Sequence, residues 1–194
     1  MAKDWPVGAL TLTVWAYWGT VVLLVFYQRL RRGRRAGVVP RNRREKRLWW
    51  GVVAVFLAWN TLPALAAVLH YGPFAAPDWA ERIPAVYALR CGAAVLAVGC
   101  YLATLSCWLR MGRNWSMAIV PGQETELVTG GLFGRVRHPI YALSILLMAC
   151  SAAVVCNVPM LLVAALHVAL MNVKARMEER HLAERHGASY AAYC

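Results

Sequence analysis

Long apolar segments are the feature that most constrains this chain. Three of them reach the length of about 20 residues that a helix needs to cross roughly 30 Å of hydrocarbon. They cover residues 7–27, 48–69 and 85–109. Tryptophans at or near their ends are typical of the aromatic residues that anchor membrane helices at the lipid surface. These are Trp5, Trp15, Trp18, Trp49 and Trp50. We expect three membrane-spanning helices here.

A fourth apolar segment, residues 140–170, is too long for one ordinary span. Asn157 and Pro159 lie at its centre, and both residue types are typical of a turn. The segment is therefore predicted to form a tight hairpin of two helices. The expected fold is an all-α integral membrane protein with five transmembrane helices, the last two a helical hairpin, and a cytoplasmic C-terminal helix.

Composition supports this fold and argues against other classes. The chain is 60% hydrophobic and 15% charged, which leaves too few polar residues to cover a soluble domain. Its formal net charge of +12 comes from residues between and beside the apolar segments, without the aromatic–basic interleaving of nucleic-acid-binding proteins. We therefore expect membrane lipids, and no nucleic acid, as partners. The six cysteines show no CxxC pair or zinc-like spacing, so we expect no metal site and no disulfide.

The distribution of positive charge predicts the orientation. Residues 29–47 hold ten of the 21 Lys and Arg residues, and short basic loops stay on the cytoplasmic side. Counting spans from there places the N-terminus and residues 71–84 outside, and residues 110–139 and the tail after Met171 inside. Both inside segments are basic, as this orientation requires. The Ala- and Arg-rich composition favours a bacterial inner membrane, and we expect the first apolar segment to remain as a span rather than a removed signal peptide.

The tail is predicted to be helical. Residues 173–193 are rich in helix formers, and Gly187 near their end predicts a helix that continues out of the fifth span to about His186. Tyr190 and Tyr193 would then face the same side of a short final turn. No Gly- or Ser-rich linker separates a second domain. We expect one membrane domain, with two spans and the basic loop in residues 1–84 and the third span, hairpin and cofactor-binding part in residues 85–194.

The segment before the hairpin carries unusual polar residues. Glycines at 130 and 131 let the backbone approach a ligand closely, where it can read an adenine edge. Pro139 suits the first position of the next helix, which leaves Arg137 and His138 at a helix N-terminus that favours a carboxylate. Tyr141 would point toward the same place. Each residue alone also has an ordinary explanation, as an interfacial cation, a helix cap and an aromatic-belt residue.

The segment after the hairpin carries Glu178 and Glu179, two of only nine acidic residues. They lie where the positive-inside bias favours Lys or Arg. A carboxylate here can hold a ligand's ammonium group while Arg137 holds its carboxylate, which describes a zwitterionic amino acid moiety. Pairing of Lys174 with Glu178 along the helix is the alternative, and it leaves Glu179 unexplained. Because a hairpin returns the chain to the face it left, the two segments predict one cytoplasm-facing pocket.

These residues resemble a known family. The similarity lies in residues 112–116, in residues 127–141 with their Arg-His-Pro-x-Tyr string, in the Glu178-Glu179 pair and in the Gly and Tyr residues that follow. Together they resemble the isoprenylcysteine carboxyl methyltransferase family and the related phospholipid methyltransferases. Members commonly run several residues past the tyrosines, whereas this chain stops at Cys194.

The resemblance implies S-adenosylmethionine as methyl donor, with a lipophilic acceptor that enters from the bilayer. The implied cofactor-binding residues are Leu127, Val128, Gly130, Arg137, His138, Tyr141, Glu178 and Glu179. The implied catalytic residues are His138, Tyr141 and Lys174, and the implied acceptor-binding residues are Asn114, Trp115 and Lys174. Methyl transfer from a sulfonium is an in-line displacement, so holding donor and acceptor collinear in a dry pocket would supply most of the rate.

Alternatives remain for the methyl acceptor and for the class of reaction. A carboxylate of an isoprenoid- or prenylcysteine-like molecule is the expected acceptor, but Lys174 is a point charge where an Arg would grip a carboxylate at two points. In a bacterial membrane, where prenylated proteins are not an obvious substrate, a lipid, an isoprenoid or a small lipophilic carboxylate or thiol is at least an equal candidate. An amine acceptor would need a general base, with His138 or Glu178 as candidates. The alternative functions are an NADPH-dependent membrane reductase of sterol reductase type and a non-catalytic membrane protein that retains the fold.

Overall fold

A computed structural model describes residues 4–32, 43–116 and 126–193, and every regular element in these ranges is a helix. Residues 33–42 of the predicted basic loop and residues 117–125 before the hairpin lie outside the described residues. The cytoplasmic placement of the middle of the basic loop therefore stays a prediction.

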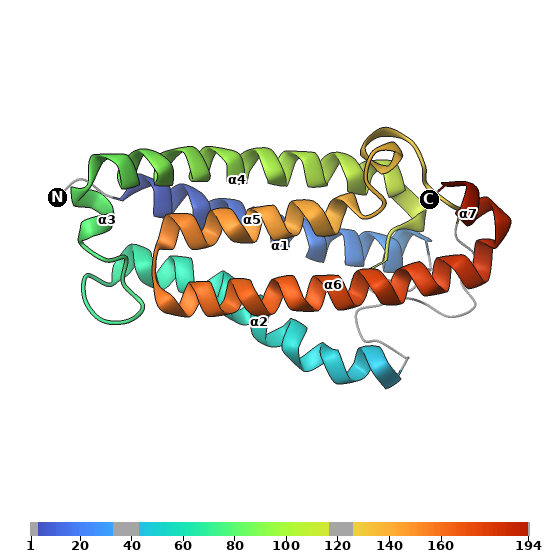
Figure 1. Cartoon of the computed structure of the whole chain (residues 1–194), viewed down its shortest axis with the longest axis horizontal. Helices are drawn as coiled ribbons and strands as arrows, with labels where there is room; N and C mark the ends of the chain where they lie inside the picture. The colour runs from blue at the N-terminus through green and yellow to red at the C-terminus, as the bar shows by residue number, and fades with distance from the viewer. Residues whose placement is uncertain (1–3, 33–42, 117–125, 194) are drawn as a thin grey trace.

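Five long helices build the molecule and run along its length, with α2 crossing at an angle (Figure 1). They are α1 (Trp5–Arg32), α2 (Arg43–Val68), α4 (Pro84–Met111), α5 (Pro139–Val155) and α6 (Val158–His186). All except α5 contain a segment long and apolar enough to cross a membrane. The apolar α5 has 17 residues, a rise of about 25 Å, at the lower limit for a span. The predicted all-α integral membrane fold is confirmed.

The predicted hairpin forms at the predicted place. Helix α5 ends at Val155, and Cys156 adopts a left-handed conformation with φ 57° that reverses the chain. Asn157 then caps α6, since its side-chain oxygen accepts a hydrogen bond from the Met160 amide at 3.0 Å. Its amide nitrogen donates to the Phe74 carbonyl at 2.9 Å. Asn157 thus starts one helix and fixes a distant loop beside it.

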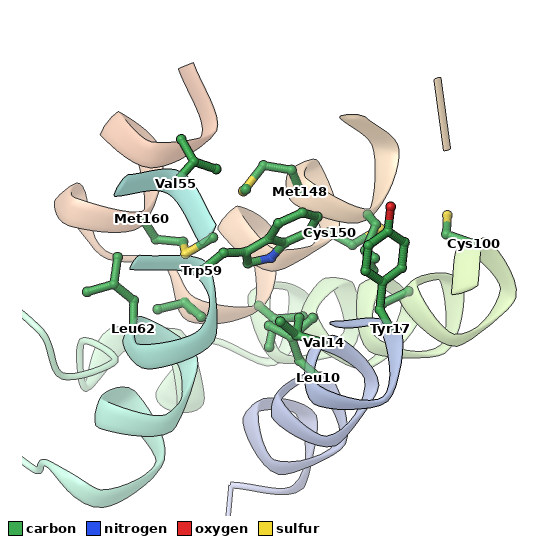
Figure 2. Close-up of a cluster of buried hydrophobic side chains, with 14 of the residues drawn as sticks. Leu10, Val14, Tyr17, Val55, Trp59, Leu62, Cys100, Met148, Cys150 and Met160 are labelled. Carbon is green, nitrogen blue, oxygen red and sulfur yellow. The ribbon is translucent and has the colours of Figure 1, made fainter. Parts of the chain in front are cut away.

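The core lies between all five long helices (Figure 2). Trp59 of α2 is fully buried at its centre, and its indole nitrogen donates to the Ser151 hydroxyl of α5 at 2.9 Å. Large apolar side chains also cover the outer surface, including Leu12, Leu23 and Leu162. An exposed apolar surface of this kind suits contact with lipid rather than water.

The end of the bundle near the N-terminus is closed by a buried arginine. Arg90 of α4 is fully buried. Its Nε donates to the Val154 carbonyl at 2.8 Å, and one terminal nitrogen donates to the Ala80 carbonyl at 3.4 Å, in the short helix α3 (Trp79–Arg82). The other terminal nitrogen pairs with Asp4. A buried charge is tolerated because it is paired and hydrogen-bonded. We call this the far end.

At the opposite end, α4 finishes, α5 begins and α6 finishes (Figure 1). Short helices η1 (Gly112–Asn114), η2 (Gly131–Gly134) and α7 (Ala188–Tyr193) surround these helix ends. Helix α6 continues to His186 as predicted, and Gly187 (φ 48°) ends it in a backbone conformation that L side chains rarely adopt. The two polar segments expected to meet do lie together here. We call this end the mouth.

Candidate functional site

A cavity of about 230 Å³ opens at the mouth and extends into the bundle. Its walls come from α1, α2, α4, α5, α6 and α7 and from the segments around η1 and η2. The predicted site residues on its walls are Asn114, Trp115, Leu127, Val128, Arg137, His138, Tyr141, Lys174 and Glu178. The sequence therefore identified much of this cavity's outer part.

The start of α5 positions Arg137 and His138. Pro139 begins the helix as predicted, and His138 precedes it in a non-helical conformation whose carbonyl accepts the first turn's hydrogen bond from Ala142 at 3.0 Å. This places the His138 ring partly inside the cavity wall, while the Arg137 side chain is 51% exposed. The N-terminus of a helix is a place where backbone amides and the helix dipole favour an anion.

Helix α6 brings the two glutamates to these residues. Arg137 lies 3.4 Å from a carboxylate oxygen of Glu179. The two ring nitrogens of His138 lie 3.7 Å from Glu178 and 3.4 Å from Glu179. Glu178 lines the cavity, and Glu179 reaches the site through these pairs. The mouth therefore brings one guanidinium, one imidazole and two carboxylates together, and such a set could hold both ends of a zwitterionic ligand.

Tyr141 and Lys174 lie deeper along the same two helices. The Tyr141 ring stacks on the His138 ring, with centroids 5.5 Å apart and planes 17° apart. The Lys174 ammonium lies 6.0 Å from the Tyr141 ring centroid, close enough for a cation–π attraction. This stack gives the cavity a flat aromatic wall with one positive charge over it.

Asn114 and Trp115 form the opposite wall after α4. The Asn114 side-chain oxygen accepts a hydrogen bond from the Glu126 amide at 3.3 Å, and both residues line the cavity. Trp115 is buried. From α1, the Gln28 amide donates to the Gly112 carbonyl at 2.7 Å and so fixes the end of α4.

Gly130 lies near the site but not on the cavity wall. A Cβ added at Gly130 or at Gly131 would come within 2.7 or 2.8 Å of the Arg110 guanidinium. Gly131 also has φ 68°. The glycines therefore make room for an arginine of α4 and for a backbone turn, whereas the sequence suggested that they make room for a ligand. Leu127 and Val128 do line the cavity.

Several cavity residues were not identified from the sequence. Helices α1 and α2 contribute Tyr17, Trp18, Val21 and Val52, and α5 and α6 contribute Ser144 and His167. Ser144 follows Tyr141 by three residues and His167 precedes Lys174 by seven, so each lies on the cavity face of its helix. That spacing was the available signal for Ser144 and His167. The sequence of α1 and α2 gave no comparable signal for the cavity residues of these helices.

The C-terminal turn completes the cavity. The Tyr193 hydroxyl donates to the Phe133 carbonyl at 2.6 Å, and both residues line the cavity. Tyr190 is buried beside it, with the two rings 6.1 Å apart, so both tyrosines face the same side as predicted. Helix α7 thereby shields part of the mouth from water.

Comparison with known families gives one result. The family described as phospholipid methyltransferase matches residues 87–189, just over half of the chain. The matched region runs from α4 into α7 and contains every predicted site residue. Helices α1 and α2 lie outside it. No curated protein and no solved structure matches the chain.

Proposed function

The chain belongs to the phospholipid methyltransferase family, and from that premise we propose that it transfers a methyl group from S-adenosylmethionine to a lipophilic acceptor. The observation that carries the proposal is the pairing at the mouth of the Arg137 guanidinium and the His138 ring with the carboxylates of Glu178 and Glu179. S-adenosylmethionine supplies an activated methyl group on a sulfonium, and it carries an amino acid moiety that needs both signs of charge.

The mouth fits that moiety because its own ion pairs can be exchanged. One carboxylate of Glu178 or Glu179 would hold the ammonium group, while Arg137 and the N-terminus of α5 would hold the carboxylate. When a zwitterion separates Arg137 from a glutamate, its carboxylate becomes the new partner of Arg137 and its ammonium group becomes the new partner of the glutamate. The Arg137 and Glu179 side chains are 51% and 31% exposed, so their pair contributes about 1 kcal/mol or less and its replacement costs little.

Tyr141 and Lys174 would lie around the reacting end. The Tyr141 ring offers an aromatic surface that a sulfonium cation can contact. The Lys174 ammonium would anchor an anionic group of the acceptor. That group is the carboxylate of an isoprenoid- or prenylcysteine-like molecule in the expected reaction. The phosphate of a phospholipid suits the same charge, and the family match favours it.

Helix α7 and the η1 segment would keep water out of this site. The proposed topology puts the mouth, and so the C-terminus, in the cytoplasm of a bacterial cell. The start of α1 and the end of α7 lie at opposite ends of the bundle (Figure 1), which fits termini on opposite sides of a membrane. A reporter enzyme fused to either terminus in cells would check it, with activity expected on opposite sides of the membrane.

Equilibrium binding of radiolabelled S-adenosylmethionine to the purified protein in detergent tests the cofactor. We expect saturable binding that His138→Ala and Glu179→Ala abolish and Glu184→Ala, on the exposed surface of α6, leaves unchanged. Binding of NADPH in place of S-adenosylmethionine would make the reductase alternative correct. Methyl-transfer assays against lipophilic acids, thiols and phospholipids would then identify the acceptor.

A further inference from the structure

Lys174 places a positive charge on the cavity wall beside the Tyr141 ring. Its side chain is half-buried on α6, and both residues line the cavity. The Lys174 ammonium lies 6.0 Å from the centroid of the Tyr141 ring, within the distance at which the negative face of an aromatic ring attracts a cation. The aromatic surface that a sulfonium would contact therefore already has a cation near it before any ligand binds.

The carboxylate of Glu178 lies about one helical turn away from this charge. Glu178 follows Lys174 by four residues, so the two side chains are neighbours on one face of α6. In S-adenosylmethionine two methylene groups separate the sulfonium from the carbon that bears the ammonium, and the two charges lie about 5 Å apart, close to the length of one helical turn. A donor whose ammonium is held by Glu178, with its chain pointing into the cavity, therefore brings its sulfonium to the level of Lys174.

Two positive charges at this level repel each other. Water and salt screen such a repulsion strongly at an exposed surface but less at a half-buried position. Glu178 can offset part of the Lys174 charge along the helix, but the ammonium of the donor takes up the same carboxylate in the proposed complex. Lys174 therefore disfavours the sulfonium, although the Tyr141 ring itself favours a cation.

The repulsion acts on the donor and not on the product. During methyl transfer the acceptor atom forms a bond to the methyl carbon, and the bond between this carbon and sulfur breaks. Its electron pair stays on sulfur, which becomes the uncharged thioether of S-adenosylhomocysteine. The amino acid moiety, the ribose and the adenine ring are unchanged. A positive charge near the sulfur therefore distinguishes the two molecules, whereas groups that bind the amino acid moiety treat them alike.

We propose that Lys174 is a specificity-determining residue, which lowers the affinity of the site for S-adenosylmethionine relative to S-adenosylhomocysteine. The inference rests on the proposed function, because it takes the mouth as the site of the methyl donor. It gives Lys174 a second role besides anchoring an anionic group of the acceptor. The bias makes the reaction sensitive to accumulated product.

Equilibrium binding of both molecules to the purified full-length protein in detergent tests this role without requiring methyl transfer. The quantity measured is the ratio of the dissociation constant of S-adenosylmethionine to that of S-adenosylhomocysteine. Lys174→Met should lower this ratio about five- to fiftyfold, the range for two like charges about 7 Å apart in partly screened surroundings. Lys174→Arg keeps the charge and should keep the ratio. Arg176→Met is the matched control, since it removes the same charge from an exposed position two residues further along α6, on another face of the helix.

Three results would overturn the role of Lys174. They are an unchanged ratio in Lys174→Met, a higher ratio in that variant, and an equal fall of the ratio in Arg176→Met, which would mark an effect of net charge. Lys174→Gln also removes the charge and decides the question even where Lys174→Met does not fold. Binding of neither molecule to the unaltered protein would count against the proposed function as well. Binding of both molecules with an unchanged ratio in the variant counts against the role of Lys174 alone.

Discussion

An arginine meets a carboxylate at both ends of the bundle, in opposite surroundings. At the far end Arg90 is fully buried, and each of its three side-chain nitrogens has a partner. At the mouth Arg137 is half exposed and lies 3.4 Å from Glu179. The first pair holds α3, α4, α5 and the start of the chain together. The second is accessible to a ligand. Burial and complete hydrogen bonding, more than the presence of an ion pair, separate a charge that holds the fold together from one that a ligand can reach.

The largest effect is expected at the far end. Arg90→Met should lower the free energy of unfolding by about 3–5 kcal/mol, because it leaves Asp4 largely buried without its partner. Chemical unfolding in detergent measures this loss. Arg82→Met is the matched control, since its 3.4 Å pair with Asp78 is exposed on both sides and should contribute almost nothing. Equal free energies of unfolding for the two variants would show that the buried ion pair stabilises the fold no more than an exposed one.

The mouth should show the reverse behaviour. Glu179→Gln should weaken S-adenosylmethionine binding by about 10- to 100-fold, the range for a hydrogen bond to a charged group. Its free energy of unfolding should change by less than about 1 kcal/mol, because the pairs it breaks are partly exposed. Calorimetric binding and unfolding of one sample measure both quantities. A variant that unfolds easily yet binds normally would show that this pair, too, is structural.

The elements of the fold could be predicted because membrane length and helix signals are local. Proline at 139, glycine at 187 and the turn at 156–159 are where the structure begins or ends its helices. The approach of Glu178 and Glu179 to His138 followed from topology alone, since a hairpin brings its two flanks to one face. These inferences needed no knowledge of which side of a helix packs inward.

The inner part of the site could not be predicted for a physical reason. Lipid tails are as apolar as a protein core, so a membrane helix shows no polar face to mark its outside. Nothing in α1 indicated that Tyr17 and Trp18 line a cavity while Leu12 faces outward. The sequence also does not show in which direction a long side chain extends. The position of the Arg110 guanidinium beside Gly130 was therefore not predicted. Arg90 had a signal that was overlooked, as an ionisable residue within a span needs a partner.

A smaller loss of stability is expected from a substitution in the hairpin turn, which tests how much this turn stabilises the far end. Asn157→Ala should lower the free energy of unfolding by about 1–2 kcal/mol, because the variant loses a helix cap and the bond to the Phe74 carbonyl. Thermal unfolding in detergent measures the change. Asn172→Ala serves as the control, since that exposed asparagine bonds only within its own helix. A loss no greater than that of the control would mean that the hairpin turn does not stabilise the far end.

The smallest effect should be a gain. Cys156 adopts a left-handed conformation that costs a non-glycine residue about 1–2 kcal/mol. Glycine avoids this strain, but it also loses more conformational entropy on folding, which offsets part of the gain. Cys156→Gly should therefore raise the free energy of unfolding by about 0.5 kcal/mol, measured by the same thermal method. Cys156→Ala keeps the strain and should show no gain. If alanine stabilises as much as glycine, the thiol rather than the backbone is unfavourable there.

The contact between Trp59 and His167, with ring centroids 5.1 Å apart, has a spectroscopic consequence. A buried indole against an imidazole emits according to the polarity and hydrogen bonding of that imidazole. Occupation of the inner end of the cavity should therefore alter the emission of Trp59 without any added label. Replacing the exposed Trp50 by phenylalanine would lower the background. The protein thus contains its own optical indicator of whether a ligand has entered the cavity.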